Sequence, residues 1–231
     1  ADILDATSNH NDGTKKDANE PIEATGQVGQ GQSFDGIDDY IDIGNLGDLG
    51  TTYTAEAVAK FDNVTSNDIV VSYRTDDETD ANNVAIQLDK DGDDARFIVR
   101  DEDMSHTGVA KKTNILAIDT WYYLAGYRNG NTTSIQVDAG TAATDIASFG
   151  TVRGTRGGIG AFYNDYLDDV FSDFAAITIC EVRISSTARS AAWIGATYDS
   201  LWDTLLSYGA EETGGSEPES SSNILFIFSN F

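Results

Sequence analysis

Apolar and polar residues alternate with a period of two in short segments along most of the chain. This period places successive side chains on opposite faces of a β-strand. Gly, Asn and Asp separate the segments, as is typical of turns. About twelve to fourteen strands at this spacing predict two packed antiparallel sheets, a jelly-roll sandwich. The clearest segments are residues 53–61, 68–74, 81–88, 96–101, 121–128, 133–138, 157–162 and 175–181.

Three pairs of segments predict hairpins. Asn129-Gly130, between residues 121–128 and 133–138, is the strongest two-residue hairpin signal in the chain. Residues 32–43 alternate around Asp35-Gly36 and predict a second hairpin. The third joins residues 81–88 to 96–101 through the sequence DKDGDD at residues 89–94. Its alternating carboxylates resemble the start of a calcium loop, but the spaced Glu and flanking helices of an EF-hand are missing. A solvated hairpin turn is the favoured interpretation.

Residues 181–198 predict a strand followed by one short helix. Val182 and Ile184 alternate with Glu181 and Arg183, which indicates a half-buried strand ending in EVRIS. Ser190 then provides a hydroxyl that can cap a helix from Ala191 to about Tyr198 or Leu201. The spacing predicts that an apolar stripe of this helix lies on a sheet while Arg189, Ser190 and Asp199 face water; the stripe contains Trp193, Ile194, Thr197, Tyr198 and Leu201.

Several motifs together resemble one known family. They are DATSNHNDGT at residues 5–14, GQSFDGIDDYIDIG at 31–44, DTWYYLAGYRNGNTTSIQVDAG at 119–140, and EVRIS, ARS-x-x-WI and GAEE toward the end. In this order they resemble a laminin-G-like domain of the concanavalin A-like lectin/glucanase superfamily. The resemblance implies an all-β, concanavalin A-like jelly-roll sandwich of two antiparallel sheets with one short C-terminal helix. We therefore expect one such domain over residues 1–212.

Composition agrees with a single folded domain. The chain has 231 residues, of which 40% are hydrophobic, including 10 Phe, 10 Tyr and 3 Trp, enough for a sizeable core. Cys180 is the only cysteine, so an intramolecular disulfide is excluded, and we expect a buried thiol at the edge of the closing strand.

The net charge of the chain argues against two classes of partner, nucleic acids and anionic membranes. With 39 acidic and 14 basic residues the formal net charge is −25. A nucleic-acid partner is disfavoured because such binding needs a basic surface, and an anionic membrane is disfavoured for the same reason. Abundant carboxylates keep a secreted protein soluble. The family resemblance implies a location outside the cell, or on a cell or particle surface. No membrane span is predicted, because the apolar segment at residues 223–231 is far shorter than the ~20 residues that a spanning helix needs.

The family resemblance implies a structural Ca²⁺ ion near the opening loop. Its oxygen ligands would be Asp5, Asn11 and the Gly13 carbonyl, helped by the closing strand. The family often has an Asp directly before EVRI, where this chain has Cys180, a poor calcium ligand. The alternative is an Asx-turn loop capped by its own side chains.

An enzyme is not predicted. Glucanases of the superfamily carry paired carboxylates in a Glu-x-Asp-x-(x)-Glu array, which this sequence lacks. The nearest cluster, residues 101–103, has consecutive acidic positions that point to opposite faces of a strand, so a solvated turn is favoured. His10 and His106 lie in polar segments without a nucleophile or metal-ligand spacing.

Sugar binding is a separate expectation, because aromatic rings on such sandwiches stack against sugar rings. The candidate residues near loops are Tyr73, Tyr127, Tyr163 and Tyr166. The alternative for each is half-buried packing within a strand.

The C-terminal residues predict an assembly segment. Residues 213–222 are polar and predict a flexible linker, and residues 223–231 predict an apolar strand. Only four residues precede the opening loop, where the family has an apolar strand. We therefore predict a non-catalytic structural or adhesive surface subunit that binds copies of itself by strand donation. Insertion of the strand into its own chain, or a stub left by cleavage of a longer protein, is the alternative for this segment. The alternatives are a monomeric glycan-binding lectin module that binds surface polysaccharide and, third, a glycoside hydrolase. The donated side chains would be Ile224, Leu225, Phe226, Ile227, Phe228 and Phe231.

Overall fold

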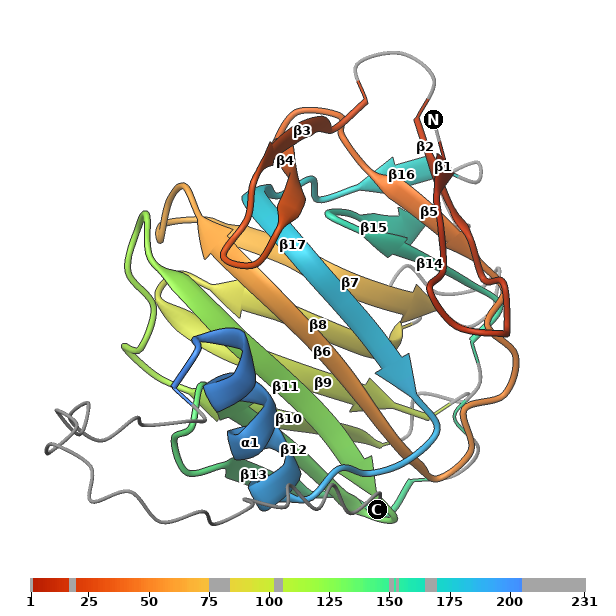
Figure 1. Ribbon diagram of the computed structural model, residues 1–231. Helices are drawn as coiled ribbons and strands as arrows, with labels where there is room; N and C mark the ends of the chain where they lie inside the picture. The colour runs from red at the N-terminus through yellow and green to blue at the C-terminus, as the bar shows by residue number, and fades with distance from the viewer. Residues whose placement is uncertain are drawn as a thin grey trace, which may run out of the picture.

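Two large antiparallel β-sheets pack face to face, with one helix on the outside (Figure 1). The computed structural model describes residues 2–16, 20–74, 84–101, 106–149, 152, 154–164 and 170–204. Within these residues the predicted all-β sandwich with one short helix is confirmed.

Within the described residues the two sheets contain eight and seven strands. In spatial order the eight-stranded sheet consists of β1 (Asp2–Ile3), β2 (Gly13–Lys15), β5 (Ile41–Gly44), β14 (Arg156–Ile159), β7 (Asn67–Arg74), β8 (Val84–Asp91), β9 (Asp94–Arg100) and β10 (Thr107–Lys112). The seven-stranded sheet consists of β13 (Ala143–Ile146), β12 (Thr132–Val137), β11 (Trp121–Asn129), β6 (Thr52–Phe61), β17 (Ala176–Ser185), β4 (Gln30–Asp35) and β3 (Ile22–Thr25). A separate hairpin consists of β15 (Phe162–Asn164) and β16 (Val170–Ser172).

The main core lies between the two sheets. Phe97 of β9 packs so close to β11 that a Cβ atom on Gly126 would lie 2.1 Å from its ring. Burial of one such aromatic side chain contributes about 1.5–3 kcal/mol. Side chains that point outward from the two sheets lie outside this core and can form polar clusters or binding sites. Every second residue of β6 belongs to the core: Tyr53, Ala55, Ala57, Ala59 and Phe61.

The helix α1 (Ala191–Leu201) begins where the sequence predicts. Ser190 accepts a hydrogen bond from the Trp193 amide at 3.2 Å and caps the first turn. Ile194 is fully buried against the outer face of the seven-stranded sheet, on Val58 and Tyr123. Figure 1 shows α1 in front of this sheet, so α1 covers part of its outer face.

Two of the three hairpin predictions are confirmed and one is wrong. β11 and β12 pair up to Asn129 opposite Thr132, and β8 pairs with β9. By contrast, β4 and β5 belong to different sheets, so residues 36–40 cross from one sheet to the other. This crossover is held by Asp39, which is 5% exposed and accepts a hydrogen bond from the Asp35 amide at 2.8 Å.

The solvated turn predicted at residues 89–94 is shorter than expected. Strands β8 and β9 extend to Asp91 and Asp94, which leaves a two-residue turn at Gly92, whose φ is 66°. Asp89 and Lys90 have no exposed surface, so the prediction of solvation is wrong for both. Lys90 forms an ion pair with the buried Asp68 at 2.7 Å.

Two further strand predictions also differ from the observed strands. Residues 157–162 divide at Gly160, which has a φ of 77°, into β14 and β15. Cys180 lies within β17 and not at its edge, beside a register shift between Ile179 and Glu181. Its thiol is half-buried and free.

Residues 205–231 lie outside the described residues. The linker at 213–222 and the assembly strand at 223–231 therefore stay predictions. Among the described residues, no helix combines the length and the apolar character needed to cross a bilayer.

Candidate functional site

The predicted sugar-binding tyrosines do not come together. Tyr73 is fully buried, and its hydroxyl donates to Asn45 Oδ1 at 2.8 Å, so its ring cannot stack on a ligand. Tyr163 is 6% exposed. Tyr166 lies outside the described residues. Tyr127 alone lies on the outer face that α1 covers, half-buried in the same cluster as Trp193.

An open groove follows α1 on this outer face. Its volume is about 260 Å³, and we call it the α1 groove. Its walls come from β17 and from one side of the helix, and they combine an aromatic ring, two hydroxyls and a guanidinium. The lining residues are Arg183, Trp193, Ala196, Thr197, Ser200 and Leu201.

Arg189 fixes the aromatic wall of the groove. Its guanidinium carbon lies 4.4 Å from the centroid of the Trp193 ring, a cation–π contact. Its backbone amide donates to Thr54 Oγ1 of β6 at 2.9 Å, which holds the start of the helix on the sheet. The Arg189 Nε is buried and has no hydrogen-bond partner among the described residues.

Two carboxyl groups lie beside the groove. Glu56 of β6 is 2% exposed, and the Tyr123 hydroxyl donates a short hydrogen bond to its Oε1. Burial raises the pKa of Glu56, whereas this hydrogen bond and the charges of Arg183 and Arg189 oppose the shift. Glu181 Oε1 accepts from Arg183 Nε at 2.7 Å and Nη2 at 2.6 Å. The side chains around Glu56 leave no space for a ligand.

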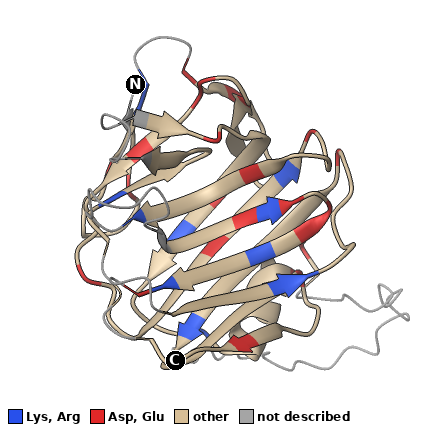
Figure 2. Ribbon diagram, turned by 180° about the vertical axis from the view of Figure 1, so that it is seen from behind, with Lys and Arg blue, Asp and Glu red and all other residues tan. Residues whose placement is uncertain are grey.

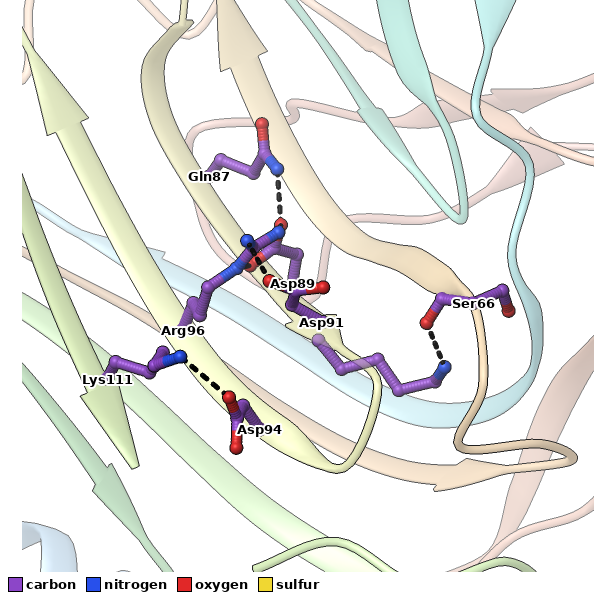
Figure 3. A network of polar contacts seen from close by, with 8 residues as sticks. Ser66, Gln87, Asp89, Asp91, Asp94, Arg96 and Lys111 are labelled. Atoms are coloured by element: carbon purple, nitrogen blue, oxygen red, sulfur yellow. Dashed lines mark hydrogen bonds and ion pairs between the residues drawn. The ribbon is translucent and has the colours of Figure 1, made fainter. Parts of the chain in front are cut away.

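The opposite outer face carries a polar network on β8 and β9 (Figure 3), which we call the β8–β9 network. Arg96 Nε and Nη2 donate to the two Asp89 oxygens at 3.1 and 2.7 Å, and Nη1 donates to Asp91 at 2.7 Å. Gln87 also donates to Asp89. Figure 2 shows acidic and basic segments side by side on the strands of this face. Each carboxylate of the network thus has a basic partner, and Asp89 is closed to solvent.

An aromatic cluster surrounds the β15–β16 hairpin. The rings of Tyr40 and Phe171 stack with centroids 3.9 Å apart, and Tyr163 lies 5.2 Å from Phe171. Arg156 pairs with Asp42 at 2.6 Å and donates to the Tyr163 hydroxyl at 3.1 Å. The rings stack on one another, and this arrangement explains why Tyr163 is buried.

The loop predicted to bind calcium is closed by its own hydrogen bonds. The two Asp5 oxygens accept from the Thr7 amide at 2.9 Å, the Thr7 hydroxyl at 2.8 Å and the Asn11 amide at 2.9 Å. These bonds lower the pKa of Asp5. Gly13 is buried in β2, and Cys180 lies on the outer face of the other sheet. The bonding matches the Asx-turn alternative, and calcium binding stays a prediction.

A second acidic cluster lies on the crossover between the sheets. Oxygen atoms of Asp35, Asp38 and Asp39 lie within 4.8 Å of one another. Lys16 forms an ion pair with Asp38, and Asp39 accepts from the Asp35 amide. These contacts give the cluster a structural role in holding the crossover.

The predicted solvated turn at residues 101–103 is partly wrong. Asp101 is 2% exposed and accepts from the His106 backbone amide at 2.9 Å, and the His106 Nδ1 lies 3.0 Å from its second oxygen. Residues 102–105 lie outside the described residues. Asp101 therefore closes the end of the β9–β10 hairpin. His10 lies in the opening loop with a φ of 56°.

The α1 groove was not predicted from the sequence, although part of its signal is present there. Arg189 lies directly before the capping Ser190, and Trp193 lies in the first turn of the predicted helix, so the two are close together in the sequence. Arg183 belongs to the alternating polar positions of β17. Only the packing of α1 on this strand reveals that the three residues share one surface.

The chain matches one known protein family over most of its length. The family model described as "Concanavalin A-like lectin/glucanases superfamily" matches residues 34–195. No curated protein matches the sequence.

Solved structures show the same fold at low identity. The botulinum neurotoxin serotype G binding domain is 8% identical with a TM-score of 0.60, over 84% of this chain and 47% of that chain. The serotype D ligand-binding domain in complex with N-acetylneuraminic acid is 11% identical with a TM-score of 0.58, over 85% and 48%. A heptameric SAP-like pentraxin from Limulus polyphemus is 11% identical with a TM-score of 0.53, over 72% and 80%. This chain therefore spans about half the length of the toxin domains.

Proposed function

Because the chain belongs to the concanavalin A-like lectin/glucanase superfamily, we propose that it is a non-catalytic carbohydrate-binding module acting outside the cell or on a surface. The observation that supports this function is the α1 groove, where Trp193 and Arg183 line an open space of about 260 Å³. This space is smaller than the ~300–1,000 Å³ of pockets for drug-sized ligands. We infer that the groove holds a short stretch of a surface polysaccharide.

The groove has the groups that a sugar ring needs. The indole of Trp193 offers an apolar surface for the C–H groups of the ring. Thr197 and Ser200 contribute hydroxyls, and Arg183 contributes N–H donors to sugar oxygens. The similar toxin domain solved with N-acetylneuraminic acid supports a sugar ligand for this fold.

The carboxyl groups beside the groove support a role without catalysis. A glycosidase needs two carboxyl groups about 5–10 Å apart with a glycosidic bond between them. Glu56 is closed off by Tyr123, and Glu181 is paired with Arg183. Because no ligand fits beside Glu56, we propose that the groove binds sugar without cleaving it.

A blocked groove tests this function. Ala196 is exposed in the groove, so Ala196→Gln should fill the space without disturbing the core. Ala192 is exposed on the same helix outside the lining, and Ala192→Gln is the matched control. On a glycan array and by calorimetry, Ala196→Gln should lose binding at least about tenfold while the control binds like the wild type. Equal binding by both variants would contradict the proposal.

A second candidate function is assembly by strand donation from residues 223–231. β3 is the last strand of the seven-stranded sheet, so its outer side offers an edge to an incoming strand. Ile22 at its start is 68% exposed and could pack against such a strand. A structural or adhesive subunit would use this edge to bind copies of itself.

Sedimentation of the full chain tests the second candidate. Deletion of residues 223–231, or Ile22→Lys, should dissolve the assemblies. Ile146→Lys is the control, since Ile146 is 75% exposed on β13 at the opposite edge of the same sheet. A wild-type chain that sediments as a monomer at all concentrations would exclude strand donation and leave the sugar-binding function untouched.

A further inference from the structure

We propose that the α1 groove selects sugars that carry a carboxylate, such as uronic and sialic acids. This inference rests on the proposed sugar-binding function and names the class of its ligand. It follows from two guanidinium groups that still have hydrogen-bond donors to offer.

Arg189 is held in place, yet no carboxylate among the described residues forms a hydrogen bond with its guanidinium. Its guanidinium contacts the Trp193 ring, and only its backbone amide is tied to the sheet, through Thr54. Within the described part of the chain, this guanidinium forms no hydrogen bond or ion pair. Stacking on an aromatic ring fixes the plane of the guanidinium, so less freedom is lost when an acceptor binds. A planar carboxylate matches two of its N–H groups.

Arg183 offers a second set of donors. Its Nε and Nη2 atoms both donate to one oxygen of Glu181, which leaves Nη1 without a partner among the described residues. The Arg183 side chain is 39% exposed and lines the groove. Both Arg183 and Arg189 act on the pKa of the same buried carboxyl, Glu56. Arg183 therefore lines the groove directly, and Arg189 lies against Trp193, which is part of the groove lining.

The negative net charge of the protein makes the two arginines around Trp193 unusual. A net charge of −25 repels anions from most of the surface. Only 14 of the 231 residues are Lys or Arg. On the opposite face, all three guanidinium nitrogens of Arg96 donate to Asp89 or Asp91. Arg183 and Arg189 keep hydrogen-bond donors that no carboxylate among the described residues occupies. Beside Trp193 they are therefore a local exception on an otherwise acidic protein. A carboxylate on a sugar bound beside Trp193 would offer these donors a charged acceptor, whereas a neutral hydroxymethyl group would gain much less.

The test compares matched acidic and neutral sugars. Calorimetry on the full chain uses trigalacturonate, a hyaluronan oligosaccharide and sialyllactose, each beside its carboxyl-reduced form. At least one acidic sugar should bind about tenfold or more tightly than its reduced form, because a charge-assisted hydrogen bond is stronger than a neutral one. Arg183→Gln and Arg189→Gln should each remove most of that difference.

Arg156→Gln is the matched control variant. The Arg156 side chain is also 39% exposed and pairs with a carboxylate at 2.6 Å, but it lies on the other sheet. It should keep the full preference for acidic sugars, with thermal melts confirming that all three variants fold. Equal binding of acidic and reduced sugars would overturn the inference and leave the sugar-binding function standing. No binding of any sugar in either form would overturn both, and an equal loss in Arg156→Gln would overturn the assignment to this groove.

Discussion

The two outer faces of the sandwich use charged residues in opposite ways. On the eight-stranded sheet, Arg96 binds Asp89 through two hydrogen bonds and Asp91 through a third, and Asp89 has no exposed surface. On the seven-stranded sheet, the Arg189 guanidinium rests on Trp193, which lines an open groove, and it forms no hydrogen bond or ion pair with the described residues. A closed network stabilises the fold, whereas rigid donors without partners are available to a ligand. The polar cluster on β8 and β9 is therefore structural, whereas the donors around Trp193 are those that we propose bind a ligand.

Removal of Arg96 should give the largest effect. Arg96→Met leaves Asp89 buried without its partner, and loss of one member of a buried ion pair costs about 3–5 kcal/mol. Urea denaturation of wild type and variant measures this loss. Arg183→Gln breaks a pair that is about one-third exposed, so its cost in the free energy of unfolding should be about 1 kcal/mol or less. Similar losses for both variants would remove the distinction between the two faces.

Loss of the helix cap should give an intermediate effect. Ser190→Ala removes the acceptor of the Trp193 amide, which typically costs about 1 kcal/mol. Because Trp193 lines the groove, sugar affinity should fall together with stability. Ser186→Ala, a nearby exposed serine outside the helix, is the control and should change neither. A Ser190→Ala variant with unchanged urea midpoint would show that tertiary packing alone holds α1.

The pH dependence of Glu56 should give the smallest effect. Burial raises the pKa of Glu56 in the folded chain above that of an ordinary glutamate, with Tyr123, Arg183 and Arg189 opposing the shift and Glu181 adding to it. Between the unfolded and folded pKa values the folded chain binds more protons, so this group lowers the free energy of unfolding as pH rises. Glu56→Gln should remove that part of the slope in denaturation measured from pH 4.5 upward. An identical slope in both proteins would contradict the assignment.

The sequence predicted what depends on local periodicity and turn chemistry. Alternation located β6 and β7 almost to the residue, Asn129-Gly130 located a hairpin, and Ser190 located the start of α1. These features depend on neighbours within a few positions. The family resemblance then supplied the arrangement of the sheets.

Features that depend on distant residues were missed. Asp35-Gly36 has the composition of a hairpin turn, but β4 and β5 pair with other strands because residues 36–40 cross between the layers. Asp89 is buried because Arg96 and Gln87 close over it, which no turn propensity reveals. Tyr73 was predicted as a sugar platform, yet it lies in the core, because alternation alone does not say which face of a strand points inward. The α1 groove exists only once the helix packs on β17.

Tryptophan fluorescence tests the central claim, sugar binding in the α1 groove, most directly. All three tryptophans, Trp121, Trp193 and Trp202, belong to the cluster around α1, so their emission reports on this face alone. Titration with an acidic oligosaccharide should shift or quench the emission to saturation in the wild type and in Ala192→Gln, but not in Ala196→Gln. Sugar binding seen by calorimetry without any change in tryptophan emission would place the ligand elsewhere and contradict the account.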